Sequence, residues 1–199
     1  MVRALLRFAG WNGGERLYDF FCGSGTFLIE AAMRATRTPA GAFRKFQGFE
    51  TLPDFSAEAW ERVKSEMDAH IVPLPPGLIF GYDVDARAMA ATRANLEGTP
   101  FASAVKFTQK DFNRLEGPFH DALVVTNPPY GVRLDEGGEL PHSLYRDFGH
   151  FLKTKCAPGR ACVLIPDPSL EKDIWFKPER RLEIDNGGIA VNANLYRMR

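Results

Sequence analysis

The sequence predicts an α/β fold in which a mostly parallel sheet carries helices on both faces. Three observations support this prediction. Short apolar segments with strand character alternate with helical patterns along most of the 199 residues. The segment 122–126 is a continuous apolar and β-branched run, typical of a strand buried on both faces. A glycine turn over 22–25 joins an apolar extended segment to a helical pattern, as at the ligand edge of an open α/β sheet.

The first expected elements surround this glycine turn. A helical pattern covers residues 2–11 and ends in a glycine-rich segment. A strand is expected over 16–21, and a helix from about Thr26 to Arg37. Because no capping residue precedes the first helix, we expect it to begin in sequence absent here, so that the chain is an excised domain.

A long insertion rich in aromatic residues is expected over 39–76. Within it, Ser56 is the expected N-cap of a helix, although Ala59 replaces the usual glutamate of a capping box. We therefore expect one domain, 1–199, interrupted by this insertion.

The remaining elements complete a sheet of seven strands. The next strands and helices are expected over 78–82, 86–96, 105–108, 122–126, 143–155 and 161–165, with a loop through Gly137-Gly138. Two last strands, over 181–185 and 189–197, flank Asn186-Gly187-Gly188, which is a strong hairpin signal. We therefore expect one antiparallel strand at the far end of the sheet.

The composition narrows the function class. Basic and acidic residues number 25 each, so the chain has no net charge, which argues against tight stand-alone nucleic-acid binding but leaves room for a local basic face. No apolar run approaches the roughly 18–20 residues that cross a membrane, and no signal peptide is visible. The three cysteines and four histidines lack metal-ligand spacing. We expect a cytoplasmic protein with reduced thiols, no membrane association and no metal.

The glycine turn is suited to holding a polar small molecule. Gly23 and Gly25 carry no Cβ and tolerate positive φ, so that a ligand can approach bare backbone. The first N–H groups of the following helix point into the same space, and Asp19 can accept hydrogen bonds from a ligand amine or ammonium. Alone, the turn is weak evidence, because the third glycine of the dinucleotide fingerprint is absent and a turn without a ligand is an equal alternative.

Further carboxylates stand at the ends of other expected strands. Asp83 could accept both ribose hydroxyls of a nucleoside, and Asp111 could accept an adenine amino group, with Phe112 beside the ring. Asp85 is better explained as the N-cap of the helix that follows. Each aspartate alone is more simply a turn or cap residue, but the set at successive strand ends favours a nucleoside site.

The segment Asn127-Pro128-Pro129-Tyr130 is the sharpest signal. The two prolines make a stiff turn, in which the Asn127 amide oxygen and the Pro128 carbonyl are acceptors and Tyr130 offers a flat face. Such a turn could hold the two hydrogens of an exocyclic amine and localise its lone pair. An amine clamp and a nucleoside site together suggest group transfer from a nucleoside cofactor, and S-adenosylmethionine, with its electrophilic sulfonium, fits.

These motifs resemble those of class I S-adenosylmethionine-dependent methyltransferases. The segments 22–32, 82–85, 127–131 and 186–187, with the aromatic insertion, look like one branch in particular. That branch is the bacterial 23S ribosomal RNA guanine-N2-methyltransferases, in which a THUMP RNA-binding domain precedes the methyltransferase domain. The resemblance implies a Rossmann-like fold, N2-methylation of a guanosine in RNA, and an RNA-binding domain missing from this chain.

Two departures from that pattern stand out. Phe20 replaces the proline that usually follows the first aspartate, which changes the stiffness of the turn. Val132-Arg133 replaces Glu-Arg, which puts an acidic contact near the clamp in doubt.

Two alternatives remain open. One is an adenine-N6 methyltransferase on DNA or RNA, because Asn-Pro-Pro-Tyr serves both chemistries. The other is a non-catalytic module that keeps the fold. A basic group of Arg34, Arg37, Arg44 and Lys45, beside Phe43 and Phe46, is a further hypothesis for contact with RNA, against a default of a solvated face.

The candidate residues fall into two groups. The catalytic candidates are Asn127, Pro128, Pro129 and Tyr130. The cofactor-binding candidates are Asp19, Phe21, Cys22, Gly23, Ser24, Gly25, Thr26, Asp83, Val84, Asp111, Phe112 and, again, Asn127.

Overall fold

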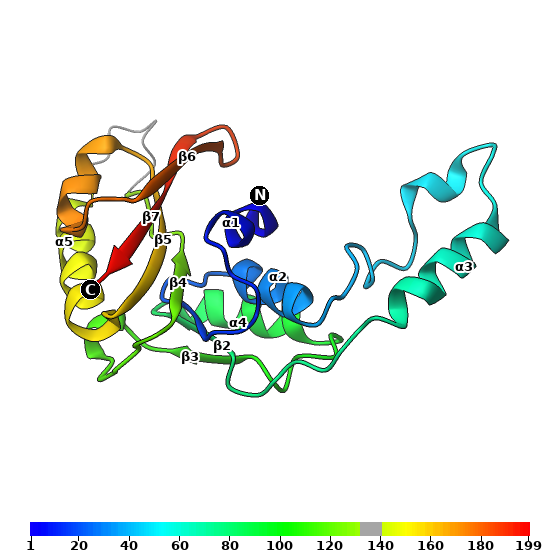
Figure 1. Cartoon of the computed structure of the whole chain (residues 1–199), viewed down its shortest axis with the longest axis horizontal. Coiled ribbons are helices and arrows are strands. Elements are labelled where there is room, and N and C mark those ends of the chain that lie inside the picture. The colour runs from blue at the N-terminus through cyan, green and yellow to red at the C-terminus, as the bar shows by residue number, and fades with distance from the viewer. Residues whose placement is uncertain (132–140) are drawn as a thin grey trace.

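The computed structural model describes residues 1–131 and 141–199 and shows a seven-stranded, mostly parallel sheet with helices on both faces (Figure 1). The predicted fold class is thereby confirmed. The expected loop through Gly137-Gly138 and the departure at Val132-Arg133 lie outside the described residues.

The strand order is β3-β2-β1-β4-β5-β7-β6. The strands are β1 (Leu17–Asp19), β2 (Ile79–Asp83), β3 (Lys106–Gln109), β4 (Leu123–Thr126), β5 (Gly159–Ile165), β6 (Arg180–Asp185) and β7 (Ala190–Met198).

The first five strands of this order are parallel, and β7 runs antiparallel between β5 and β6. The expected closing hairpin is therefore present, with its antiparallel strand one place inside the edge. The Asn186-Gly187-Gly188 turn joins β6 to β7, and both glycines have positive φ, at 68° and 89°. This left-handed backbone is what the glycines permit.

Alternate residues of the strands point into two separate hydrophobic cores, one on each face of the sheet. Leu123 and Val125 face one side of β4, whereas Val124 faces the other. The first side is covered by α1 (Val2–Phe8), α2 (Thr26–Ala35) and α4 (Ala86–Leu96). The second side is covered by α5 (His142–Phe151), which continues as a π-helical segment (Leu152–Cys156), and by the 3-10 helices Phe112–Arg114 and Pro168–Ile174. The last of these was not foreseen, because Pro168–Ile174 has no repeating apolar pattern.

The segment 39–76 projects from the body of the domain as an arm (Figure 1). Its elements are a 3-10 helix (Gly48–Thr51) and α3 (Ala57–Asp68), in which no residue is buried. Ser56 caps α3 by accepting a hydrogen bond from the Ala59 N–H, as expected. The arm leaves after α2 and returns to the start of β2, so its base lies at the edge opposite the carboxyl ends of the parallel strands.

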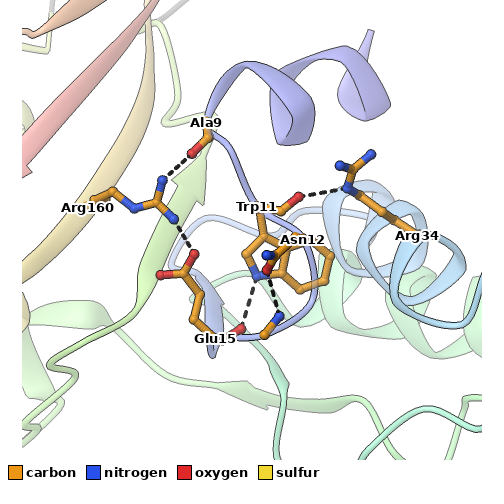
Figure 2. A network of polar contacts seen from close by, with 7 residues as sticks. Ala9, Trp11, Asn12, Glu15, Arg34 and Arg160 are labelled. Atoms are coloured by element: carbon orange, nitrogen blue, oxygen red, sulfur yellow. Dashed lines mark hydrogen bonds and ion pairs between the residues drawn. The ribbon is translucent and has the colours of Figure 1, made fainter.

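Two arginines fix the linker between α1 and β1 (Figure 2). The Arg160 guanidinium donates to the Ala9 carbonyl over 2.6 Å and to the Glu15 carboxylate. Arg34 Nε donates to the Trp11 carbonyl over 2.8 Å. Trp11 is fully buried, and its indole N–H donates to the Glu15 carbonyl. These bonds satisfy backbone carbonyls beyond the end of α1, which have no hydrogen-bond partner within the helix. They also fix the path of the chain from α1 to β1.

Candidate active site

The carboxyl ends of β1 and β4 meet because the two strands are neighbours in the sheet. Gly23, which follows β1, and Asn127, which follows β4, line one cavity of about 480 Å³. This volume lies in the range of ligand pockets, roughly 300–1,000 Å³. The cavity is lined by Phe20, Phe21, Gly23, Asp83, Val84, Asp111, Phe112, Asn113, Asn127, Pro129 and Leu144.

The glycine turn has the backbone that its sequence implied. Gly23 has a φ of 54°, and a Cβ at this position would meet no atom within 4 Å, so its backbone faces open space. Gly25 has a φ of 81°, and a Cβ there would meet the Thr92 side chain at 3.0 Å. No side chain caps the N-terminus of α2 that follows. Its first N–H groups therefore have no side-chain acceptor in the part of the chain that the structure describes.

Two side chains of α4 hold the glycine turn from behind. Thr92 Oγ1 donates to the Gly23 carbonyl over 2.7 Å, and Asn95 Nδ2 donates to the Ser24 carbonyl over 2.9 Å. The sequence reasoning missed both, since it gave only the bounds of this helix and no role for its side chains. A polar pair at i and i+3 on a helix that follows the second strand is the signal that could have found them.

The Asp83 carboxylate lies on the cavity wall and already organises the turn. Its Oδ2 accepts from the Gly23 N–H over 2.9 Å, and its Oδ1 accepts from the Asp85 N–H over 3.0 Å. Each carboxylate oxygen has a further lone pair, so Asp83 can still accept from ligand hydroxyls. Asp85 is the N-cap of α4, as expected, and accepts from the Arg87 N–H over 2.8 Å.

Asp111 and Phe112 line the cavity at the end of β3. The Asp111 carboxylate caps the short helix that follows by accepting from the Asn113 N–H over 2.9 Å. Phe112 is buried and makes an edge contact with Phe21, with ring centroids 5.3 Å apart. These two rings and Val84 form an apolar surface beside the two carboxylates, an arrangement suited to a flat ring that carries polar groups.

Asp19 is fully buried and does not line the cavity. Its Oδ1 accepts from the Phe21 N–H over 3.1 Å and from Thr126 Oγ1 over 2.5 Å, whereas its Oδ2 has no hydrogen-bond partner among the described residues. Burial raises the pKa of Asp19 from 3.8 to about 7, against the lowering effect of these bonds. The cost of burying a charge without full compensation explains the direction of the shift.

The proline turn places an unpaired acceptor at the cavity. Asn127 Oδ1 is buried and has no hydrogen-bond partner among the described residues. Buried amide oxygens rarely remain unpaired, so this one is available to a ligand donor. Pro128 is buried, and Pro129 lines the cavity. Tyr130 is half-buried, and burial raises the pKa of its hydroxyl.

Phe20, which stands where proline was expected, belongs to the aromatic core under the cavity. Its ring stacks on Tyr82, with centroids 5.6 Å apart, and meets Phe151 edge-on at 4.8 Å. This packing replaces the stiffness that a proline would give, since a fully buried ring fixes the chain at this point.

The structure brings about half of the candidate residues to the cavity. Those on its wall are Phe21, Gly23, Asp83, Val84, Asp111, Phe112, Asn127 and Pro129. Those that do not line it are Asp19, Cys22, Ser24, Gly25, Thr26, Pro128 and Tyr130. The sequence reasoning did not include Phe20, Asn113 and Leu144 among the candidates, although all three line the cavity. Burial raises the pKa of Cys22 well above its usual range, so this thiol is not poised as a nucleophile.

The basic group proposed for RNA is divided by the structure. Arg34 is committed to the Trp11 carbonyl. Arg44 and Lys45 lie on the arm, away from the cavity, where Phe43 and Phe46 are 44% and 55% exposed. Only the arm part of the group is thus placed to meet a large partner.

Among residues 1–131 and 141–199, no group of three histidine, cysteine, aspartate or glutamate side chains could hold a metal ion. Over the same residues, no helix is both long and apolar enough to cross a membrane.

A comparison with known protein families matches residues 1–189 to one family. They match the family described as the RMKL-like methyltransferase domain. The relative from Photobacterium profundum, named ribosomal RNA large subunit methyltransferase K/L, is 34% identical over 198 residues, which cover 97% of this chain and 28% of that protein. The relative of the same name from Vibrio campbellii is 32% identical and is covered to the same 28%. The chain thus spans less than a third of the length of these relatives.

Solved structures that match this fold also carry methyltransferase descriptions. SMU.472, a methyltransferase complexed with SAH, matches the whole chain at 26% identity with a TM-score of 0.89, and 52% of that protein is covered. A protein from Listeria monocytogenes, described as an N6-adenine-specific DNA methylase, matches at 25% identity with a TM-score of 0.84, and 50% of it is covered.

Proposed function

Because this chain belongs to the RMKL-like methyltransferase domain family, we propose that it is an S-adenosylmethionine-dependent enzyme that methylates the exocyclic N2 amine of a guanosine in ribosomal RNA. One observation supports this proposal above the others. Asn127 lines the cavity that the glycine turn also lines, and its buried Oδ1 has no hydrogen-bond partner among residues 1–131 and 141–199. An acceptor so placed is available to an amine hydrogen of the substrate.

The cavity fits a nucleoside cofactor. Asp83 would hold the ribose hydroxyls and Asp111 and Phe112 the adenine, while the Gly23 backbone would border the remainder; all four residues line the cavity. The relative SMU.472, which is complexed with SAH, supports S-adenosylmethionine as the cofactor of this chain. When bound, S-adenosylmethionine supplies an electrophilic methyl group on its sulfonium. Asp19 is buried and does not contact the ligand directly. Its role is to position the residues of the glycine turn.

The proline turn holds the acceptor amine. Asn127 Oδ1 and the Pro128 carbonyl accept its two hydrogens, and the Tyr130 ring stacks on the base. Because the turn is stiff, the amine is oriented before the methyl transfer rather than during it. The amine releases its proton to solvent water as the new N–C bond forms, so a neutral amide suffices and no strong base is required.

The names of the relatives support ribosomal RNA as the substrate. The K/L name refers to the large-subunit ribosomal RNA. The Listeria protein is described as acting on adenine N6 in DNA, and this description favours adenine-N6 as the second candidate. The clamp residues serve either amine, so the nucleobase must be decided by experiment.

The domain arrangement is part of the same proposal. Residues 1–199 form one methyltransferase domain, with 39–76 as an insertion, and a separate RNA-binding domain assists it. Since phosphate contacts usually supply much of the affinity for RNA and this chain has no net charge, it should bind RNA weakly alone.

The decisive experiment is a transfer of labelled methyl groups. In vitro-transcribed bacterial large-subunit ribosomal RNA is incubated with the protein and labelled S-adenosylmethionine, then digested to nucleosides and separated. We expect label in N2-methylguanosine. Label in N6-methyladenosine would establish the second candidate, and absence of label together with absence of S-adenosylmethionine binding by calorimetry would overturn the proposal.

A further inference from the structure

The turn of the β6–β7 hairpin lies at the same edge as the cavity. Because β7 is antiparallel to β5, the start of β7 pairs with the carboxyl end of β5, where Asn192 is opposite Ile165. β5 is in turn the neighbour of β4, which ends at Thr126. The hairpin turn therefore reaches past the sheet toward the residues that follow β4.

One side chain of this turn contacts the proline segment directly. Asn186 Nδ2 donates a hydrogen bond to the Tyr130 hydroxyl over 2.8 Å, and this contact is partly buried. The two residues are 56 positions apart in the chain. Tyr130 is followed by Gly131, with a φ of 97°, so the backbone beside the ring changes direction immediately. Burial raises the pKa of the Tyr130 hydroxyl, and hydrogen bonds from the Asn186 and Asn127 side chains lower it, so Asn186 is one of two amide side chains at the outer end of the ring.

The hairpin does not need the Asn186 side chain in order to close. Its turn is closed by the Asn186 N–H, which donates to the Ile189 carbonyl over 2.8 Å. The Gly188 N–H donates to Asp185 Oδ1 over 2.9 Å and completes it. Backbone and Asp185 thus suffice for the turn, and the Asn186 carboxamide is left for its contact with Tyr130.

We propose that Asn186 is a positioning residue for the methyl acceptor: it fixes the Tyr130 ring, and with it the surface on which the acceptor base stacks. This inference rests on the proposed function and extends the acceptor site to an element at the far end of the chain. An aromatic ring contributes to stacking only if its plane is held, and a hydrogen bond at the hydroxyl restricts its rotation. The hairpin turn therefore forms part of the acceptor side, opposite the nucleoside side of the cavity.

The test is a double-mutant cycle on this contact. The variants Asn186→Ala and Tyr130→Phe each remove it from one side, and the double variant removes both partners. Asn186→Asp retains it with reversed roles, because the Tyr130 hydroxyl can donate to a carboxylate. Asp185→Ala is the matched control, since it weakens the same turn without touching Tyr130.

Each variant is measured in three ways. Calorimetry gives the affinity for S-adenosylmethionine, and fluorescence anisotropy with labelled ribosomal RNA, in the presence of SAH, gives the affinity for RNA without turnover. Steady-state methyl transfer separates kcat from KM. We expect Asn186→Ala and Tyr130→Phe each to lower kcat/KM by about five- to tenfold, as for the loss of one hydrogen bond, with the cofactor affinity unchanged.

The cycle separates positioning from a structural role. The proposal requires that the double variant lose no more activity than either single variant and that Asn186→Asp recover most of the activity. If the two losses multiply, or if Asp185→Ala reproduces the Asn186→Ala loss, Asn186 only supports the hairpin and the inference is wrong. If the unaltered protein binds S-adenosylmethionine and methylates RNA but Asn186→Ala is fully active, the inference fails while the proposed function stands.

Discussion

A hydrogen bond of 2.5 Å from Thr126 Oγ1 to Asp19 Oδ1 joins the two halves of the candidate site. Asp19 ends β1 just before the glycine turn, and Thr126 ends β4 just before Asn127. Both side chains are fully buried. The nucleoside side and the acceptor side of the cavity are therefore held together by a polar contact under its floor, between residues 107 positions apart.

Replacement of Thr126 by valine tests this connection. The substitution keeps the shape of the side chain but removes the donor, which leaves the buried Asp19 carboxyl with one fewer partner. We expect a loss of about 1–3 kcal/mol in the free energy of unfolding, measured with urea. Thr126→Ser retains the hydroxyl and should lose less than half as much. Equal stability of the two variants would show that the contact contributes little.

The raised pKa of Asp19 predicts the pH dependence of stability. Its pKa in the folded chain, about 7, lies above the ordinary value of 3.8, so the folded state binds the proton more tightly than the unfolded state. Stability contributed by this group is then largest at low pH and is lost as the pH rises from about 4 through about 7, and the loss is complete by about pH 8.

The measurement compares the ligand-free protein with Asp19→Asn by urea unfolding between about pH 5 and about pH 8. Other titrating groups are common to both proteins, so the difference between the two curves reports Asp19. We expect the unaltered protein to lose stability relative to Asp19→Asn across this interval. Parallel curves would mean that Asp19 titrates at its ordinary pKa.

Asn127→Ala should abolish methyl transfer while the affinity for S-adenosylmethionine survives. The substitution removes an acceptor that has no partner within the described part of the chain, but leaves the glycine turn and Asp83 intact. By analogy with the loss of a single oriented hydrogen-bonding group in an active site, we expect kcat to fall by about 100- to 1,000-fold. Calorimetry on the same variant is the control. If the variant also loses S-adenosylmethionine binding, Asn127 has a structural role instead.

Asp83 and Asp85 form a matched pair of carboxylates two residues apart. Asp83→Asn should weaken S-adenosylmethionine binding, because it disturbs both the ribose contact and the bond to the Gly23 N–H. Asp85→Asn should leave the affinity unchanged, since Asp85 faces solvent as the cap of α4. Calorimetry on both variants makes the comparison, and an equal loss of affinity would contradict the assignment of the ribose to Asp83.

The sequence was most informative where a residue type has one strong local preference. The helix over 86–96 was predicted with its observed bounds, because Asp85 is a clear N-cap and the apolar pattern ends at Leu96. The hairpin at Asn186-Gly187-Gly188 was equally clear, since those residues favour left-handed backbone. The cavity between the ends of β1 and β4 followed from the general behaviour of parallel sheets.

The features that the sequence did not predict depend on contacts between residues that are far apart in the chain. Nothing near Asp19 indicates that it is buried under the turn rather than exposed to a ligand, since this follows from its contact with Thr126. Thr92 and Asn95 reach the glycine turn only because α4 packs beside α2. The Asn186 contact with Tyr130 required the order of β5, β7 and β6, which local patterns do not determine.

The arm offers a last prediction, on RNA affinity. Arg44 and Lys45 lie beside the exposed ring of Phe46, and such a combination of cations and aromatic rings is typical of surfaces that bind single-stranded RNA. The base of the arm is at the edge opposite the cavity, so only an extended RNA could contact both. We expect the combined Arg44→Glu and Lys45→Glu variant to bind large-subunit ribosomal RNA about tenfold more weakly at low salt, with a smaller dependence on salt concentration. Arg62→Glu, on the exposed α3 of the same arm, is the control for a general change in charge. Unchanged affinity in the double variant, or an equal loss in the control, would dispose of the arm as a specific RNA contact.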